Sequence, residues 1–275
     1  MNSTVKTIYN IDLSLANFKR KDYKPLPNTT LNEKFNVLMD VDSMNVDNPI
    51  LKGYCLGNGN IKTIGQDSKT FLHYGNHRSI DGALYSHIPF LIRELDKDLG
   101  VTDKMKYRLR KEIRIDNIDY VVYYMKVIED VSVTNQILNI TSKDGTLPKL
   151  SVFNSNDVSI LNPTPKEYTD TVTSIKDEYV TVSDQIALIL TMDELNEIKN
   201  AMSIMGLDSV STKINELAIC SGVDVVNPED MTIESAYSQV MMFVDLDYDI
   251  ELAINENKGF YREIEIGGME PISLR

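Results

Sequence analysis

The histidines come closest to a metal site of all the side chains in this chain. His73 and His77 stand four residues apart, a spacing that can place two imidazoles on one helix face as zinc ligands. Gly75 and Asn76 lie between them and favour a loop instead, and no Cys or Glu stands at a supporting distance. We interpret both residues, together with His87, as ordinary loop histidines and expect no metal and no cofactor.

Other chemical motifs are incomplete. Asp40 and Asp42 begin like a calcium loop, but Met44 occupies the third ligand position and the closing Glu is missing. The glycine-rich segment 57–60 lacks the Gly-Lys-Ser/Thr ending of a phosphate-binding loop. No nucleophile elbow or Cys-His signature occurs, so the sequence predicts that the protein is not an enzyme.

Residues 104–127 are typical of a β-hairpin with a basic outer face. Charged residues alternate there with apolar ones, at Lys104, Lys106, Arg108, Arg110, Glu112 and Arg114. A period of two places the charged set in solvent and the apolar set against the core. Asp116 and Asn117 suit a two-residue turn, because both tolerate left-handed backbone conformations. Such a turn would set three pairs opposite each other: Arg114 and Asp119, Ile113 and Tyr120, and Leu109 and Tyr124.

The net charge of −13 is unevenly distributed. Residues 51–165 carry fifteen basic and thirteen acidic side chains, whereas residues 166–275 carry seven and twenty-two. This segregation predicts electrostatic docking between neighbouring copies, with the Arg108/Arg110 face of one copy on the acidic region of the next. The candidate interface residues are Lys106, Arg108, Arg110, Arg114, Tyr123, Asp245, Asp247, Asp249 and Glu251.

The last four of these residues alternate along an expected strand and could instead gather a cation. A solvated strand edge is the simpler interpretation, because charges on an exposed edge oppose aggregation. Single-stranded nucleic-acid binding through the basic ladder is an alternative function. We rank it below a protein partner, because the acidic region would repel phosphates.

The compartment follows from features that the sequence lacks. Cys55 and Cys220 are too few for a disulfide framework, which favours a reduced, intracellular assembly environment. The N-terminus has no apolar signal-peptide core, and no apolar run approaches the roughly 18 residues that span a bilayer. We therefore expect a soluble, non-secreted protein without a membrane partner.

The pattern of elements predicts an α+β fold in three segments. Residues 1–50 read as an extended, irregular arm with one short strand at 35–39. Residues 51–165 read as a β-rich domain of antiparallel hairpins, including one at 50–63 and strands at 136–142 and 147–153. Residues 91–99 suggest a single helical turn.

Residues 166–275 read as a mainly helical, acidic domain. Thr191 and Glu194 form a capping box before a helical stripe that stops at Gly206. Apolar spacing predicts a second helix over 210–222 and a third over 227–244, which Asn227-Pro228 would open. A strand over 245–252 should then pair with one over 260–266.

Four segments resemble a family of virion structural proteins from large-genome, contractile-tailed bacteriophages. They are Pro89–Leu99, Lys106–Arg110, Tyr120–Tyr124 and Leu161–Pro165, with a fainter similarity at Ile214–Gly222. The resemblance covers about residues 50–165 and brings no catalytic residues. It implies a structural subunit of the neck, tail or baseplate.

That implication agrees with the segregated charge. Ring-forming subunits need heterologous contacts, in which one face of a copy meets a different face of the next. We expect a virion protein assembled in the host cytoplasm, as an oligomeric neck or head–tail connector component. Its partners would be copies of itself and other virion structural proteins.

Overall fold

The computed structural model describes residues 3–19, 26, 29–38, 49–59, 61–64, 70–73, 77–128, 136–141, 149–152, 178–207, 213–227, 232–251 and 259–271. Within the chain, residues 1–129 and 190–260 form one compact unit, and residues 130–189 and 261–275 form another. Each unit is therefore built from two stretches of sequence, a division that differs from the expected boundaries at 50 and 165. The possible calcium loop, residues 40–47, lies outside the described residues.

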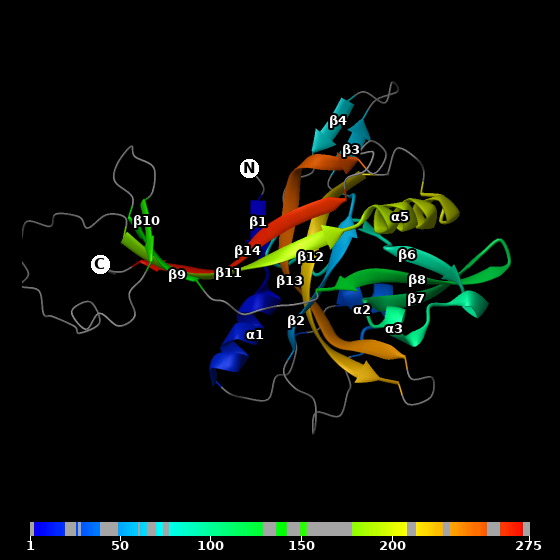
Figure 1. Cartoon of the computed structure of the whole chain (residues 1–275), viewed down its shortest axis with the longest axis horizontal. Helices are drawn as coiled ribbons and strands as arrows, with labels where there is room; N and C mark the ends of the chain where they lie inside the picture. Colours follow the sequence, from blue (N-terminus) through cyan, green and yellow to red (C-terminus); the bar gives the residue numbers. More distant parts are fainter. Residues whose placement is uncertain are drawn as a thin grey trace, which may run out of the picture. The chain divides into compact units, whose positions relative to one another are not determined.

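Unit 1 contains an eight-stranded antiparallel sheet. Its order is β1-β13-β12-β2-β8-β6, with β5 paired to β2 and β7 paired to β8. The strands are β1 (Ser3–Lys6), β2 (Ile50–Gly57), β5 (His87–Ile88), β6 (Leu91–Glu94), β7 (Tyr107–Ile115), β8 (Ile118–Val127), β12 (Lys213–Val226) and β13 (Ile233–Glu251). Figure 1 shows β12 and β13 as the long central pair of this unit.

The β7–β8 hairpin has the predicted register. Asp116 and Asn117 form the turn with φ of 47° and 66°. Ile115 lies opposite Ile118, Arg114 opposite Asp119, and Ile113 opposite Tyr120. The register is the same on both sides of Leu109, which interrupts the pairing with a φ of 52°.

A second expected hairpin, over residues 50–63, is wrong. β2 ends at Gly57 and pairs with β12, β8 and β5, whereas β3 (Ile61–Ile64) pairs with β4 (Thr70–His73). The strands were placed correctly, but the glycine-rich segment between them connects two different sheets.

The expected helical C-terminal domain is also wrong, and with it the α+β assignment: the fold is mostly antiparallel β-sheet. Residues 213–226 and 233–251 are the strands β12 and β13, and the backbone N–H of Asn227 donates to the carbonyl of Thr232 where they meet. Both faces of these strands are buried at residues 214–222 and 235–246. A strand that is buried on both faces does not alternate between apolar and polar residues. Its nearly continuous apolar residues therefore also fit the spacing of a helix.

One predicted C-terminal helix is confirmed. α5 (Met192–Ile204) begins with the capping box of Thr191 and Glu194, and Gly206 follows it with a φ of 66°. Its buried residues are Leu195, Ile198, Ala201 and Met202. Their 3.6-residue spacing on one face is what distinguished this helix from the strands after it.

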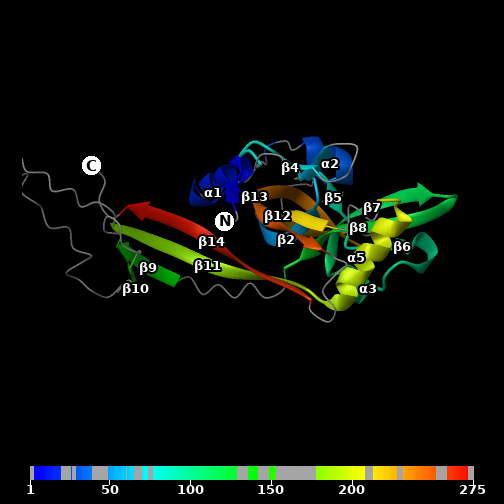
Figure 2. The ribbon, with the colours of Figure 1, turned by 90° about the horizontal axis from the view of Figure 1, so that it is seen from above.

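The N-terminal residues are folded onto the sheet, in contrast to the expected irregular arm. β1 pairs with β13, and α1 (Ile8–Lys19) and α2 (Thr29–Phe35) follow it. Tyr9 and Leu13 of α1 pack against Met241, while Leu31 and Phe35 of α2 join the main core. Figure 2 shows both helices on the same side of β12 and β13.

Short helical elements connect β6 to β7. Residues 91–99, expected as a helical turn, contain β6 and a 3-10 helix at Leu95–Lys97, and α3 spans Val101–Lys104. No described helix is long and apolar enough to cross a membrane.

Unit 2 contains a four-stranded sheet in the order β10-β9-β11-β14. Its strands are β9 (Gln136–Thr141), β10 (Lys149–Val152), β11 (Glu178–Leu190) and β14 (Phe260–Pro271). The strands predicted at 136–142 and 147–153 are confirmed as β9 and β10, and they pair antiparallel with each other. β14 was expected to pair with the end of β13, but its neighbour in the sheet is β11.

Candidate functional site

The basic ladder is less exposed than its alternation predicts. Arg108 is only 3 % exposed. Its Nε and Nη2 donate to the two carboxylate oxygens of Asp224, at 2.7 Å and 2.9 Å. Its Nη1 donates to three backbone carbonyls, those of Lys104, Met105 and Tyr107. These hydrogen bonds engage the whole guanidinium within its own subunit. Met125, opposite Arg108 on β8, is also buried, so the face expected to be exposed to solvent is packed at this point.

Arg110 and Tyr123 belong to a smaller polar cluster around Asp98. The Tyr123 hydroxyl donates to Asp98 Oδ1 at 2.8 Å, and Lys104 Nζ and Arg110 Nη2 lie 2.8 Å and 3.6 Å from Asp98 Oδ2. Burial raises the pKa of Asp98, but hydrogen bonds from Lys104, Leu99 and Tyr123 outweigh it and hold the pKa below its usual range. Burial, with the Asp98 hydrogen bond, raises the pKa of Tyr123.

The remaining interface candidates fall into three groups. Lys106 and Arg114 are exposed, paired with Asp103 at 3.1 Å and Asp119 at 3.7 Å. Asp245 is buried in β13. The side chains of Asp247, Asp249 and Glu251 lie outside the described residues, although their backbone belongs to β13.

His77 is the centre of the most elaborate buried polar cluster described in unit 1. Its side chain is fully buried, and the ring lies between two aromatic rings. The Tyr85 ring is stacked at a centroid distance of 4.2 Å and the Phe243 ring at 4.0 Å, with interplanar angles of 17° and 10°. Two near-parallel stacks hold the imidazole in one plane, so that its nitrogens point in fixed directions.

Glu216 receives the hydrogen bond of this imidazole. His77 Nε2 donates to Glu216 Oε2 at 2.7 Å, and the carboxylate is completely buried. Three backbone N–H groups also donate to it, from Gly59, Tyr85 and Ser86. Four donors are enough to satisfy a buried carboxylate, and three of them come from the backbone and do not titrate.

Two further carboxylates face His77. Asp245, the cross-strand neighbour of Glu216, accepts from the His77 backbone N–H at 3.2 Å and lies 3.8 Å from Nε2. Asp81 Oδ2 lies 3.8 Å from His77 Nδ1, a nitrogen without a hydrogen-bond partner among the described residues. Burial raises the pKa of Asp81, but hydrogen bonds from Arg78 outweigh it and the pKa is lowered.

The cluster joins three parts of unit 1 that are distant in sequence. His77, Asp81 and Tyr85 come from the segment before β5, Glu216 from β12, and Asp245 from β13. A His–Glu pair resembles the pairs that activate nucleophiles, but this ring is enclosed by its own stacking partners. Its hydrogen bonds hold the backbone of segment 77–86 against β12 and β13, and we interpret the cluster as structural.

His77 lies in a loop, as predicted, but it is a buried member of a polar cluster and not an ordinary loop residue. His87 was also predicted in a loop but lies in β5. The side chain of His73 is outside the described residues, and across those that are described no group of three or more His, Cys, Asp or Glu side chains could hold a metal ion. One sequence signal did point to the cluster: Glu216 is a single carboxylate inside the apolar stretch 214–222. A buried carboxylate requires donors, and a histidine is an obvious one.

His87 is a second buried histidine, and it is neutral. Its ring meets that of Phe35 edge-on at 4.9 Å, and its two ring nitrogens are enclosed without a hydrogen-bond partner among the described residues. Burial, aided by the charges of Lys34 and His77, lowers the pKa of His87 to about 3.

This depressed pKa predicts a pH-dependent stability. In the unfolded chain His87 has a pKa near 6.5 and binds a proton below that pH, whereas in the folded chain it stays unprotonated down to about pH 3. Stability is thus complete above about pH 6.5 and falls as the pH decreases through this window, by up to about 1.4 kcal/mol per pH unit. Replacing His87 by Phe should remove this part of the slope. Urea unfolding of both proteins over the window measures it, and parallel stability curves would contradict the prediction.

A groove of about 430 Å³ lies between α2, β7 and β13. Its charged lining is balanced: Glu33, Lys34, Arg110, Lys111, Glu112 and Glu234. Such a lining does not favour a strongly anionic ligand over a neutral or mixed one.

Comparison with known proteins places the chain in a family. The model described as "Family of unknown function (DUF7208)" matches residues 1–275. The chain belongs to this family. Neither a curated protein nor a solved structure matches it significantly. The match runs over the residues of both compact units.

Proposed function

We propose that this DUF7208 protein is a non-enzymatic structural subunit of a tailed-bacteriophage virion. It assembles with copies of itself in the host cytoplasm, as an oligomeric component of the neck or head–tail junction, and contacts other virion proteins there. The observation that supports the proposal is the far end of the β7–β8 hairpin, where exposed charged and apolar side chains lie together.

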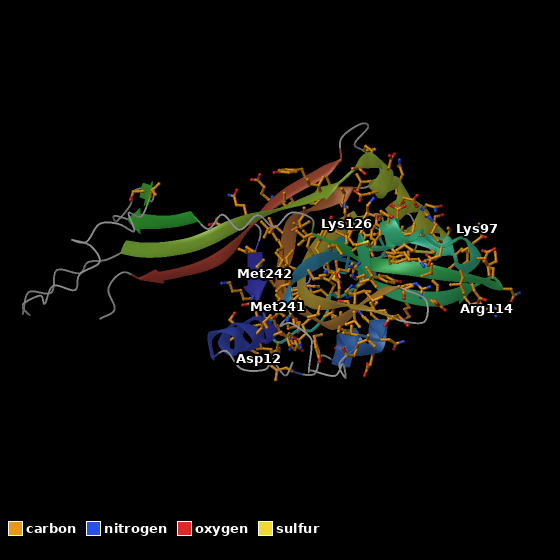
Figure 3. The ribbon with its side chains drawn as sticks, turned by 60° about the horizontal axis from the view of Figure 1, so that its bottom comes forward. Asp12, Lys97, Arg114, Lys126, Met241 and Met242 are labelled. Atoms are coloured by element: carbon orange, nitrogen blue, oxygen red, sulfur yellow. The ribbon has the colours of Figure 1, made fainter. Side chains whose placement is uncertain are left out.

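The hairpin is buried at its base and exposed at its tip. Residues 107–109 and 121–125 are buried, whereas most residues of 111–119 are exposed. The Arg114 side chain is 64 % exposed, and Ile118 is 43 % exposed. Figure 3 shows Arg114 at the end of the hairpin, far from Met241 and Met242 in β13. An exposed apolar residue beside a charged pair, Arg114 and Asp119, is suited to a heterologous contact between subunits.

The resemblance to virion proteins supports the same region. Pro89–Leu99 contains β6, Lys106–Arg110 enters β7, and Tyr120–Tyr124 lies in β8, which pairs with both. Three of the resembling segments therefore form adjacent strands around the hairpin. The fourth, Leu161–Pro165, lies outside the described residues.

A tip variant tests the assembly. Arg114→Glu combined with Ile118→Asp should reduce the oligomer to smaller species, because it removes the apolar contact and reverses the adjacent charge. The subunit should stay folded, since changes at exposed sites cost about 1 kcal/mol or less. Mass measurement in solution reports the assembly, and chemical unfolding reports the fold.

A matched control carries the same chemical changes elsewhere on unit 1. Lys6→Glu with Ile11→Asp also reverses one exposed cation and replaces one exposed apolar residue. Ile11 is 62 % exposed and precedes Asp12, which Figure 3 shows far from Arg114. The control should keep the wild-type mass. A monomeric wild type, an unchanged mass in the tip variant, or equal losses in both variants would overturn the proposed contact.

A baseplate or other tail position is the first alternative. Antibody labelling of intact particles separates the two ends of the tail, and label at the baseplate would replace the neck assignment.

Single-stranded nucleic-acid binding is the alternative from another class. Arg108 and Arg110, the centre of the ladder, are engaged by Asp224 and Asp98, which leaves mainly Lys106 and Arg114 for phosphates. We expect affinity for single-stranded DNA no tighter than about 10⁻⁴ M at physiological salt. A micromolar, steeply salt-dependent complex that is lost when Lys106 and Arg114 become Glu would reverse this ranking.

A further inference from the structure

Two free cysteines from distant parts of the chain lie side by side in the core of unit 1. Cys55 is in β2 and Cys220 in the neighbouring strand β12, 165 residues later. Both are completely buried, and their sulfur atoms are 3.9 Å apart.

The strand pairing allows the two sulfurs to come closer. Cys55 lies opposite Ala218 and Cys220 opposite Gly53, so the cysteines are diagonal neighbours on one face. Gly53 has no side chain of its own, and Met125 Cγ and the carbonyl oxygen of Lys126 lie where its Cβ would be. The register of β12 also shifts on both sides of Cys220, and such irregularities allow a side chain to be re-aimed. A disulfide needs the sulfurs to approach to about 2.05 Å. Because diagonal neighbours usually lie about 7–8 Å apart, a small backbone shift at this irregularity must accompany the rotation of the side chains.

We propose that Cys55 and Cys220 form an intrachain disulfide when the protein meets an oxidising thiol–disulfide environment. With glutathione disulfide as oxidant, one cysteine thiolate attacks it and releases one glutathione thiol. The second cysteine then attacks the mixed disulfide and releases the other. Two protein thiols are oxidised, one glutathione disulfide is reduced to two thiols, and the protein protons pass to the released thiolates.

The buried position determines when the bond forms. The hydrogen bond with Cys220, together with burial, raises the pKa of the Cys55 thiol well above its ordinary value. The thiolate is therefore scarce in the folded protein, and exchange takes place during folding or when β2 and β12 separate locally. The bond would close a loop of 165 residues, and long loops give the largest expected stabilisation. This inference does not depend on the proposed virion role.

Oxidative refolding in glutathione buffers tests the pairing. Reduced, denatured chain is refolded at a series of ratios of thiol to disulfide, quenched, alkylated and weighed intact. A parallel series stays in denaturant. If the native geometry favours the bond, the folded chain should resist reduction better than the denatured chain. The glutathione buffer in which half of the folded chain is oxidised should be at least about tenfold more reducing than the buffer that gives half oxidation of the denatured chain. The oxidised protein should also unfold roughly 5–15 °C higher than the reduced one.

Single and double alanine variants are the controls. Cys55→Ala and Cys220→Ala should show neither the internal bond nor the increase in unfolding temperature, and the double variant should not respond to oxidant. Equal or less reducing midpoints for the folded chain would overturn the proposal. Interchain dimers or glutathione adducts in place of the internal bond would also overturn it.

Discussion

Replacing Arg108 by alanine should lower the free energy of unfolding by about 3 kcal/mol, although its place in the alternating sequence suggests an exposed residue. The change leaves Asp224 with Lys52 as its remaining described partner, and it removes the donor to three backbone carbonyls. Removing one member of a buried ion pair typically costs about 3–5 kcal/mol, and the 34 % exposure of the Asp224 side chain places this case toward the lower end. Urea or guanidinium unfolding measures the loss.

Lys106→Ala is the matched control on the same strand. Its side chain is 49 % exposed and its partner Asp103 is 59 % exposed, so the cost should stay below about 0.5 kcal/mol. Asp224→Asn, alone and combined with Arg108→Ala, isolates the pair in a double-mutant cycle. Equal costs for Arg108→Ala and Lys106→Ala would show that the buried pair contributes nothing. The result also decides how assembly must be tested, because charge reversal at Arg108 would damage the subunit itself.

Replacing His77 by alanine should have the largest single effect, a loss of about 4 kcal/mol. The substitution removes a ring packed between Tyr85 and Phe243 and takes one of four donors from the buried carboxylate of Glu216. Cavities of aromatic size cost about 3–5 kcal/mol by themselves. Equilibrium unfolding gives the total, and hydrogen exchange should show the loss first in segment 77–86.

His77→Phe separates the two contributions. Phenylalanine keeps the stacking and cannot donate to Glu216, which retains its three backbone donors. We expect it to recover at least about 1–2 kcal/mol of the alanine loss. If His77→Phe and His77→Ala lower the free energy of unfolding equally, the ring stacking contributes no stability. The hydrogen bond from His77 to Glu216 would then account for the whole effect.

The elements that could be predicted from sequence are those with a local cause. The hairpin turn depends on Asp116 and Asn117, which adopt the left-handed conformation, and its register follows from the two-residue length. Thr191 and Glu194 cap α5 within one turn of chain. In each case the decisive interaction lies within a few residues, so a short window of sequence contains it.

The strands β12 and β13 could not be recognised in this way. Each is covered on both faces by other parts of unit 1, so its pattern is continuous rather than alternating. Asn227 and Pro228 suggested a helix start, whereas Asn227 bonds to Thr232 across the connection of two strands. The pairing of β12 with β13 extends to Lys213 and Glu251, 38 residues apart, and Glu216 of β12 pairs with Gly57 of β2, 159 residues away. A local window of sequence does not contain these partners.

Sequence reasoning missed the burial of Arg108 and the polar cluster of His77 for a related reason. Alternation assumed that only one face of β7 is buried, but Arg108 and Leu109, which follow each other in the strand, are both buried. His77 looked like a loop residue, because its partners Glu216 and Asp245 lie about 140–170 residues further along the chain. A buried charged residue can be recognised from sequence only when its partner, distant in the chain, is also known.

Because β1 pairs with β13, near the other end of the chain, the sheet of unit 1 cannot be completed until late in translation. Thr7 donates to the carbonyls of Val240 and Met241, and the latter is 234 residues away. At ribosomal rates of about 5–20 residues per second, roughly 10–50 s pass before the partner of this segment emerges. Until then the sheet lacks β12 and β13, and the outer edge of β2 has no strand beside it. We expect nascent chains to remain protease-sensitive until residues past 250 have been translated, and then to become protected in one step. Protease-resistant chains arrested at residue 200 would show that unit 1 folds earlier than its topology requires.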